Sequence, residues 1–174
     1  MCNRLCIFKW SPQQHRGSAA TALACAFCIG HGDSFLGIRS ELYTLGFVAS
    51  LATKLADTFA SEIGKAYGKT TFLITTFERV EPGTEGAVSA EGTAAAVVGG
   101  LLLSLYGWAV GLIKMPGGVV LSTVAAFLAT NFESLLGATL QEKEGMSFLT
   151  NEVVNFINTL VGAGIAIGAG ALVL

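Results

Sequence analysis

The chain has 174 residues, of which 52% are hydrophobic and 13% are charged, and its formal net charge is -2. Ordinary soluble domains carry roughly 25% charged residues. A slightly acidic chain also lacks the basic surface that a nucleic-acid backbone attracts, which argues against nucleic acid as a partner. The composition therefore predicts an integral membrane protein whose main partner is the lipid bilayer.

The first half of the chain predicts a tail and then a membrane-embedded region. Residues 1–17 are polar and basic, whereas residues 18–174 predict a single membrane-embedded helical domain. Residues 18–30 are apolar but short for a crossing, which needs about 20 residues. Residues 41–68 predict one long helix in which Ala60, Gly64 and Gly68 recur at a spacing that lets helices approach closely.

Residues 70–91 predict one longer polar loop, because Pro82-Gly83 and Gly86 are turn signals. Residues 92–113 then form an uninterrupted run without a charge, which is typical of a transmembrane helix. We expect a tight turn at Pro116-Gly117-Gly118 and two further spans over 119–140 and 151–174. The predicted fold is an all-α, multi-pass bundle of about five transmembrane or membrane-embedded helices.

Basic residues are distributed unevenly between the two predicted faces of the membrane. If residues 18–30 cross, the N-terminal side carries most of them, and the opposite side carries only Arg39 and Lys114. The positive-inside rule then places the N-terminal side in the cytoplasm-like compartment. The basic residues of that side are Arg4, Lys9, Arg16, Lys65, Lys69, Arg79 and Lys143.

Acidic and amide side chains occur at membrane depth, where charge is costly and usually functional. Asp57 and Glu133 each lie about two turns from a helix end on the side of the 70–91 loop. Asn151, Asn155 and Asn158 share one face of the last helix at the same depth. We therefore expect these groups and the loop to converge near one membrane surface.

These residue types suit phosphoryl transfer. Carboxylates with room for water are ligands that Mg²⁺ prefers, and a glycine-rich loop with hydroxyl groups can hold phosphate oxygens. Two stripes run along the 41–68 helix: one has Lys54, Asp57, Ser61, Gly64 and Gly68, and the other has Thr58, Glu62, Lys65 and Lys69. Lys65, Lys69 and Arg79 would add positive charge.

Structural roles are open for several of these groups. Asp57 has Lys54 one turn away as an ion-pair partner, and the asparagine face also suits interhelical hydrogen bonds. Glu133 is the hardest to explain structurally, because its own helix offers no basic neighbour. The glycine pairs Gly107/Gly111 and Gly164/Gly168 favour helix packing faces.

Four ordered sequence blocks resemble the integral-membrane family of transmembrane protein 19, which also contains the plant phytyl-phosphate kinase of the chloroplast envelope. The likeness covers residues 33 to 174 and is strongest to the plant members. Family members carry more helices before this point, so the resemblance implies an N-terminally shortened member. The blocks are Leu55-Ala-Asp-Thr-Phe-Ala-Ser-Glu-Ile-Gly64, Pro82-Gly-Thr-Glu-Gly-Ala-Val-Ser89 with Glu91-Gly-Thr93, Glu133-Ser-Leu-Leu-Gly-Ala-Thr-Leu-Gln141, and Leu149-Thr-Asn-Glu-Val-Val-Asn155.

The resemblance implies a plastid-envelope phosphotransferase that converts phytyl phosphate to the diphosphate for tocopherol synthesis, with a nucleoside triphosphate as donor and Mg²⁺ as cofactor. We assign Asp57 and Glu62 to Mg²⁺. The expected catalytic residues are Asp57, Glu62, Glu133 and Asn155. The expected binding residues for substrate and nucleotide are Ser61, Lys65, Arg79, Gly83, Thr84, Glu85, Gly86, Ser89 and Asn151.

Two other functions stay open at this stage. A transporter or channel component would need polar residues along a whole pathway, and the far halves of the last three predicted spans are apolar. A non-catalytic membrane scaffold would keep its function after the carboxylates are neutralised.

Overall fold

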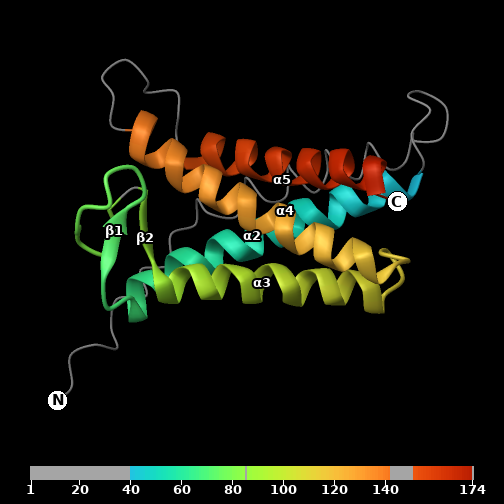
Figure 1. The fold of residues 1–174 in the computed structure, drawn as a ribbon, viewed down its shortest axis with the longest axis horizontal. Coiled ribbons are helices and arrows are strands. Elements are labelled where there is room, and N and C mark those ends of the chain that lie inside the picture. Colours follow the sequence, from blue (N-terminus) through green and yellow to red (C-terminus); the bar gives the residue numbers. More distant parts are fainter. Residues whose placement is uncertain (1–39, 85, 142–150, 174) are drawn as a thin grey trace.

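The computed structural model describes residues 40–84, 86–141 and 151–173. Predictions for the basic tail, the 18–30 stretch, Glu85 and the 142–150 loop lie outside these residues. The described elements, in chain order, are α2 (Ser40–Tyr67), β1 (Thr71–Leu73), β2 (Ala87–Ser89), α3 (Ala90–Ala109), α4 (Pro116–Leu136), the π-helical turn η2 (Gly137–Gln141) and α5 (Asn151–Val173) (Figure 1).

Three of the helices are long and apolar enough to cross a membrane. They cover Ala90–Ala109, Pro116–Thr139 and Val153–Val173. The fourth long helix, α2, is less apolar because charged residues interrupt it. The mostly helical fold and its membrane-spanning segments are thus confirmed, while the expected count of about five helices includes the 18–30 stretch, outside the described residues.

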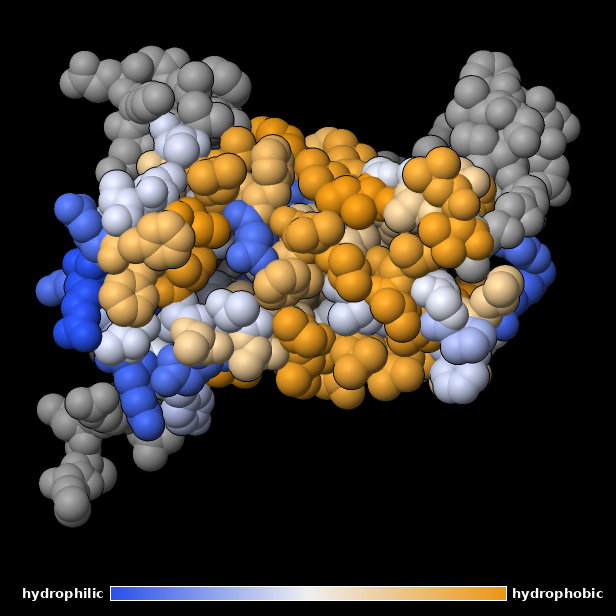
Figure 2. Space-filling model, viewed as in Figure 1, coloured by the Kyte–Doolittle hydropathy of each residue, from blue (hydrophilic) through white to orange (hydrophobic). Residues whose placement is uncertain are grey.

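Helix α2 lies at the centre of the bundle and packs against α3, α4 and α5. None of its residues from Leu42 to Ser61 is exposed. The other three helices turn large apolar side chains outward, among them Leu102, Val120 and Leu160. Figure 2 shows the resulting hydrophobic band between hydrophilic ends. Such a surface suits contact with lipid chains rather than with water.

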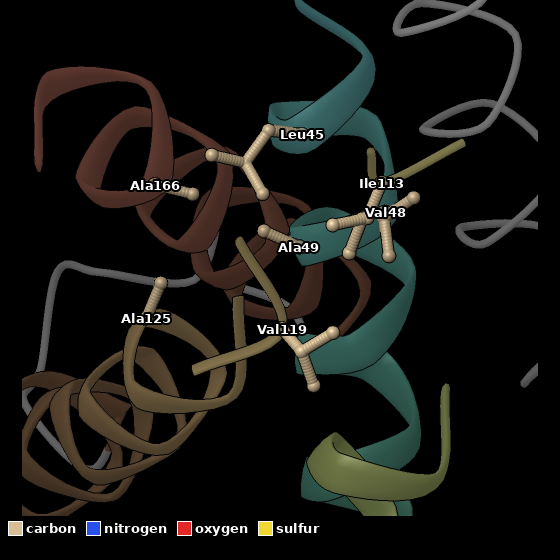
Figure 3. Close-up of a cluster of buried hydrophobic side chains, with 7 residues drawn as sticks. All are labelled: Leu45, Val48, Ala49, Ile113, Val119, Ala125 and Ala166. Carbon is tan, nitrogen blue, oxygen red and sulfur yellow. The ribbon is translucent and has the colours of Figure 1, made fainter. Parts of the chain in front are cut away.

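Small residues dominate the interior, which lets the helix backbones approach closely. The buried residues include Ala49, Ala52, Ala56, Ala125 and Ala129. Larger side chains cluster near the Lys114 end, where Leu45 and Val48 of α2 meet Ile113 and Val119 (Figure 3). Because lipid tails are as apolar as these side chains, close packing rather than burial from water stabilises such a bundle.

The predicted small-residue stripe on α2 forms the contact with α3. A Cβ placed at Gly92 would lie 2.8 Å from the Ala60 carbonyl oxygen and 3.2 Å from Gly64 Cα. Gly164 and Gly168, expected to form a packing face, are exposed, and no atom of the described residues would lie within 4 Å of a Cβ at either. Instead, Gly162 faces Thr53 across the contact between α2 and α5.

Helix ends differ from the prediction where local capping decides them. Helix α3 begins at Ala90, because the Ser89 side chain accepts a hydrogen bond from Gly92 N at 3.1 Å and so caps the helix. Pro116 does not form a tight turn; it starts α4, a position at which proline needs no backbone hydrogen bond. Gly111, which has a φ of +79°, lies in the turn after α3. It does not pack against another helix of the described residues, since none of their atoms would lie within 4 Å of a Cβ there.

The region predicted as a plain loop contains a small antiparallel sheet. Strands β1 and β2 pair with Thr71 opposite Ser89 and Leu73 opposite Ala87. The connecting segment turns back on β1, with Val80 N donating to Thr71 O at 3.0 Å. Figure 1 shows this hairpin at one end of the bundle, next to the start of α3. The sheet holds the connecting segment in place over the helix ends.

Candidate functional site

A cavity of about 180 Å³ lies at the hairpin end of the bundle. Its walls come from α2, α3, α4, the hairpin and the start of α5, so segments distant in sequence meet there. The polar and glycine residues that line it are Lys54, Asp57, Ser61, Gly64, Lys65, Thr71, Gly83, Thr84, Gly86, Ser89, Gly92, Thr93, Thr130, Asn131, Glu133, Ser134, Gly137 and Asn155.

A lysine and a carboxylate form an ion pair on the α2 wall. Lys54 Nζ lies 2.9 Å from Asp57 Oδ2, and the two side chains are only 19% and 17% exposed. Lys54 Nζ also donates a hydrogen bond to Asn155 Oδ1 on α5. The structural reading of Asp57, as the partner of Lys54, is therefore correct, and the pair itself lines the cavity.

Glu133 brings a second carboxyl group into the cavity from α4. Asn158 Nδ2 donates to Glu133 Oε2 at 2.5 Å, and the Glu133 carboxyl group interacts directly with that of Asp57. Two carboxylates so close repel each other unless a cation or a shared proton lies between them. Asn158 is fully buried, and its Oδ1 has no hydrogen-bond partner in the described part of the chain.

The amino end of α3 faces the cavity through Ser89, Gly92 and Thr93. The first backbone N–H groups of a helix and its dipole favour an anion at that end. Ser89 already satisfies Gly92 N, and Thr93 donates its hydroxyl hydrogen to Ser89 O at 2.8 Å. The helix dipole thus places partial positive charge at this end of the cavity, and the acidic residue Glu91 also lies in the first turn of α3.

The hairpin segment covers the cavity with backbone rather than with large side chains. Gly83 and Gly86 adopt positive φ values of +100° and +74°, which suit glycine. Gly86 packs so tightly that a Cβ there would lie 2.4 Å from Ala138 Cβ. Lys65 Cε lies 3.9 Å from where a Cβ at Gly83 would be, so a lysine flanks the glycines.

The structure assembles most of the predicted site residues around this cavity. Asp57, Glu133 and Asn155 converge, as expected from their common depth. The other expected residues that line it are Ser61, Lys65, Gly83, Thr84, Gly86 and Ser89.

Four predicted residues are not among those that line the cavity. Glu62 is exposed and lies on the other stripe of α2, away from Asp57. Arg79 is exposed, with its guanidinium carbon 6.0 Å from the Phe72 ring centroid. Glu85 lies outside the described residues, and Asn151 is placed only as the first residue of α5.

Sequence reasoning missed Lys54 as a site residue, together with Thr130, Asn131 and Ser134 of α4. The signal for Lys54 was present, because it shares a stripe with Asp57 and Ser61. Thr130, Asn131 and Ser134 lie within one helical turn of Glu133 along α4, so they occur at about the same depth in the bundle. The side-chain amide nitrogen of Asn131 donates a hydrogen bond to Phe127 O at 2.8 Å, so only the side-chain oxygen of Asn131 is left to accept one.

The donor set suits Mg²⁺ in part. Asp57 and Glu133 carry hard oxygen ligands and come from different helices, and the amide oxygen of Asn155, which also lines the cavity, accepts a hydrogen bond from Lys54. Within the described ranges no three His, Cys, Asp or Glu side chains gather as a metal cluster. Mg²⁺ nevertheless needs only one or two carboxylates when waters and substrate phosphates complete its shell.

Comparison with known proteins places the chain in a family. Residues 11–163 match the family described as integral membrane protein DUF92. An uncharacterized membrane protein, sll0875, from Synechocystis is 56% identical over 161 residues, which cover 92% of this chain and 60% of the relative. Protein VTE6, chloroplastic, from Arabidopsis thaliana is 46% identical over 160 residues, which cover 90% of this chain and 46% of the relative.

A more distant relative extends the family beyond photosynthetic organisms. The uncharacterized membrane protein MJ0933 from Methanocaldococcus jannaschii is 43% identical over 125 residues, which cover 71% of this chain and 50% of the relative. The chain thus spans about half the length of the curated relatives it matches. No solved structure matches it. The chain belongs to the integral membrane protein DUF92 family, as the sequence resemblance indicated, and it is a multi-pass membrane protein.

Proposed function

We propose that the chain is a membrane phosphotransferase that acts on a prenyl phosphate such as phytyl phosphate. A phosphate oxygen of the acceptor attacks the terminal phosphorus of a nucleoside triphosphate. The bond from that phosphorus to the bridging oxygen breaks, which releases nucleoside diphosphate and leaves the prenyl diphosphate. The sequence resemblance supplies the acceptor and the link to tocopherol synthesis.

One observation carries the proposal: a single cavity combines two carboxylates, a half-buried lysine, a helix amino end and a glycine-rich cover. Phosphoryl transfer needs little covalent chemistry from a protein and depends on positioning and charge stabilisation. The carboxylates are suited to a metal ion, and the amino end of α3 is suited to phosphate oxygens. Both kinds of group face the same small volume.

The position of the cavity also suits an acceptor with an apolar tail. Helices α3 and α4 touch where Ser104 Oγ donates to Ser122 Oγ at 2.9 Å, and they diverge toward the hairpin in Figure 1. The cavity lies on the diverging side, between Thr93 and Ala96 of α3 and Thr130 of α4. The outer faces of both helices are apolar. A prenyl tail can therefore stay in lipid while its phosphate reaches the cavity.

Each group has a distinct role in this proposal. Asp57 and Glu133 would hold Mg²⁺, which when bound neutralises phosphate charge. Backbone N–H groups at the start of α3 and around Gly83 and Gly86 orient phosphate oxygens. Lys65, beside Gly83, adds a cation at the outer mouth of the cavity. Glu62, expected to bind metal, is assigned no role because it is exposed.

A transporter is less well supported by the arrangement of polar groups. Toward the Lys114 end the interior consists of Leu45, Val48, Ile113 and Val119. In the described part of the chain, the buried groups between that cluster and the cavity are hydroxyls such as Ser50, Thr53 and Ser104, which bond to main-chain carbonyls. An ion path would need polar groups that continue through this half.

The test uses purified protein in detergent with phytyl phosphate, a nucleoside triphosphate and Mg²⁺. Asp57→Asn should lower the rate of phytyl diphosphate formation about 100-fold, as loss of a transition-state charge contact does. Glu62→Gln is the matched control on the same helix and should keep the rate within about twofold of wild type. Equal rates for wild type and Asp57→Asn, or no product from wild type, would contradict the proposal.

We also place the protein in a plastid envelope or a related photosynthetic membrane. A relative named as chloroplastic and a cyanobacterial relative support this location. A fluorescent fusion, imaged beside envelope and thylakoid markers in plant cells, tests it. Signal in the plasma membrane or endoplasmic reticulum would contradict it.

A further inference from the structure

Lys54 is the most unusual charged residue of the bundle. Its ammonium group lies among three helices, paired with Asp57 on its own helix and bonded to Asn155 on α5. It also interacts electrostatically with Glu133 on α4. One positive charge thus faces two carboxylates, and the side chains of Lys54 and Asp57 are only 19% and 17% exposed.

We propose that Lys54 and Mg²⁺ compete for the same carboxylates, and that binding of the metal turns Lys54 toward a substrate phosphate. This inference rests on the proposed function and adds a specific role for a residue that the sequence did not single out. Lys54 acts as a positioning cation: it holds the carboxylates together before the metal binds and neutralises phosphate afterwards.

The low exposure of the pair, 19% and 17%, favours such an exchange. A carboxylate left unpaired in a largely shielded site is unfavourable, so Asp57 is more stable when it is bonded to either Lys54 or a metal ion. An ammonium group displaced by the metal faces the same cost and needs a new anion. A phosphate oxygen in the cavity meets that need, because lysine is a compact charge on a flexible stem and a common phosphate ligand.

The arrangement of the neighbours supports this direction of movement. Asn155 accepts from Lys54 through Oδ1 and gives the ammonium group an uncharged partner when Asp57 turns to the metal. Asn158 bonds Glu133 Oε2 and fixes that carboxyl group, while its own buried Oδ1 has no partner among the described residues. One amide therefore holds the Glu133 carboxyl group and the other holds the Lys54 ammonium group, and neither adds charge.

The test measures metal binding without substrate, using Mn²⁺ as the probe and electron paramagnetic resonance of the purified protein in detergent. Lys54→Gln, which removes the charge and keeps a hydrogen-bond donor, should bind Mn²⁺ about tenfold more tightly than wild type, because a competing cation is gone. Lys114→Gln is the matched control, since Lys114 pairs with Glu41 at the same 2.9 Å distance at the other end of the bundle. Its Mn²⁺ affinity should equal that of wild type.

A second measurement on wild type covers the case in which Lys54→Gln fails to fold. Amine-reactive labelling followed by peptide mass spectrometry should show that Mn²⁺ increases modification of Lys54 and leaves Lys114 unchanged. Unchanged or weaker Mn²⁺ binding in Lys54→Gln, or labelling of Lys54 that does not rise with Mn²⁺, would overturn the exchange.

Kinase activity is scored separately, so the two proposals can fail independently. An inactive wild type with tighter Mn²⁺ binding in Lys54→Gln would keep the exchange and contradict the proposed function. An active wild type whose Mn²⁺ affinity does not depend on Lys54 would keep the function and contradict the exchange.

Discussion

The bundle holds two lysine–carboxylate ion pairs with an N–O distance of 2.9 Å, one at the Lys114 end and one beside the cavity in the hairpin half, and the pairs differ in their surroundings. Lys114 and Glu41 are 67% and 51% exposed, whereas Lys54 and Asp57 are 19% and 17% exposed. Water screens the first pair, and such exposed pairs contribute about 0–1 kcal/mol to stability. The second pair is shielded by three helices, and its charges act strongly on each other and on any ligand.

The interior of the bundle is also apolar beside the exposed ion pair and polar beside the shielded one. Near Lys114 the bundle is filled by Leu45, Val48 and Val119, while near the hairpin it contains a cavity lined by polar groups. Filled, apolar packing suits structural stability. A polar cavity inside a membrane bundle costs stability and is retained where chemistry needs it. The Lys114 end therefore serves mainly to stabilise the bundle, and we assign the proposed reaction to the cavity near the hairpin.

Glu133→Gln should produce the largest effect at the functional end. We expect about a 100-fold loss of phosphotransferase rate, because one of two cation-binding carboxylates is removed. The same change relieves the repulsion between Glu133 and Asp57, so the thermal midpoint in detergent should stay equal to wild type or rise. A variant that is inactive only because it unfolds at lower temperature would count against a functional role for Glu133.

Alanine at two helix-contact glycines should distinguish the packing of the two ends. A Cβ at Gly92 would lie 2.8 Å from the Ala60 carbonyl oxygen, which is backbone, while one at Gly118 would lie 2.7 Å from Ile113 Cγ2, which is a side-chain end. Overpacking costs about 1–3 kcal/mol where neighbours cannot move. Gly92→Ala should therefore lower the thermal midpoint clearly and Gly118→Ala only slightly, and the reverse order would contradict this view of the α2–α3 contact.

Alanine substitutions at two glycines with similar positive φ test whether the contact of the hairpin segment with η2, at the end of α4, matters for the proposed reaction. Gly86 and Gly111 have φ values of +74° and +79°, but only Gly86 is pressed against Ala138. Each alanine substitution carries the left-handed backbone cost of about 1–2 kcal/mol. Gly86→Ala should in addition lower the phosphotransferase rate about tenfold by shifting the cover of the cavity. Equal rates in the two variants would mean that the cover has no part in the reaction.

The smallest effect is expected at the exposed ion pair. Glu41→Gln should change the free energy of unfolding by less than about 1 kcal/mol, and the change should shrink further at high salt because the pair is screened. Its phosphotransferase rate should match wild type. A loss of activity in this variant would show that the two ends are coupled and would weaken the division proposed above.

Much of this arrangement follows from the sequence alone. Long apolar runs locate α3, α4 and α5, and helix geometry places Asp57, Glu133 and Asn155 at one depth. Distances along each helix are fixed by the rise per residue, so depth can be predicted. The spacing of small residues on α2 also predicts a close helix contact, and the structure supplies its partner, Gly92 of α3.

The rotation of each helix about its own axis, and the side chains that meet between helices, could not be predicted in the same way. Asp57 and Glu62 were both assigned to Mg²⁺, yet they lie on different stripes of α2, and only the packing of α3–α5 decides which stripe faces the cavity. The bond from Lys54 to Asn155 joins residues 101 positions apart, and no local pattern encodes it. The small sheet was missed because three-residue strands carry too little periodicity to separate from a loop.

The enclosure of α2 from Leu42 to Ser61 has a consequence for how the protein enters its membrane. Helices α3, α4 and α5 are apolar enough to partition into lipid individually, whereas α2 carries Lys54 and Asp57 in its middle. A lone helix with these charges is poorly accepted by the insertion machinery. Helix α2 is therefore stable in the membrane only after α3, α4 and α5, which are synthesised later, surround it. The charged residues proposed to act in the reaction thus also delay the completion of membrane insertion.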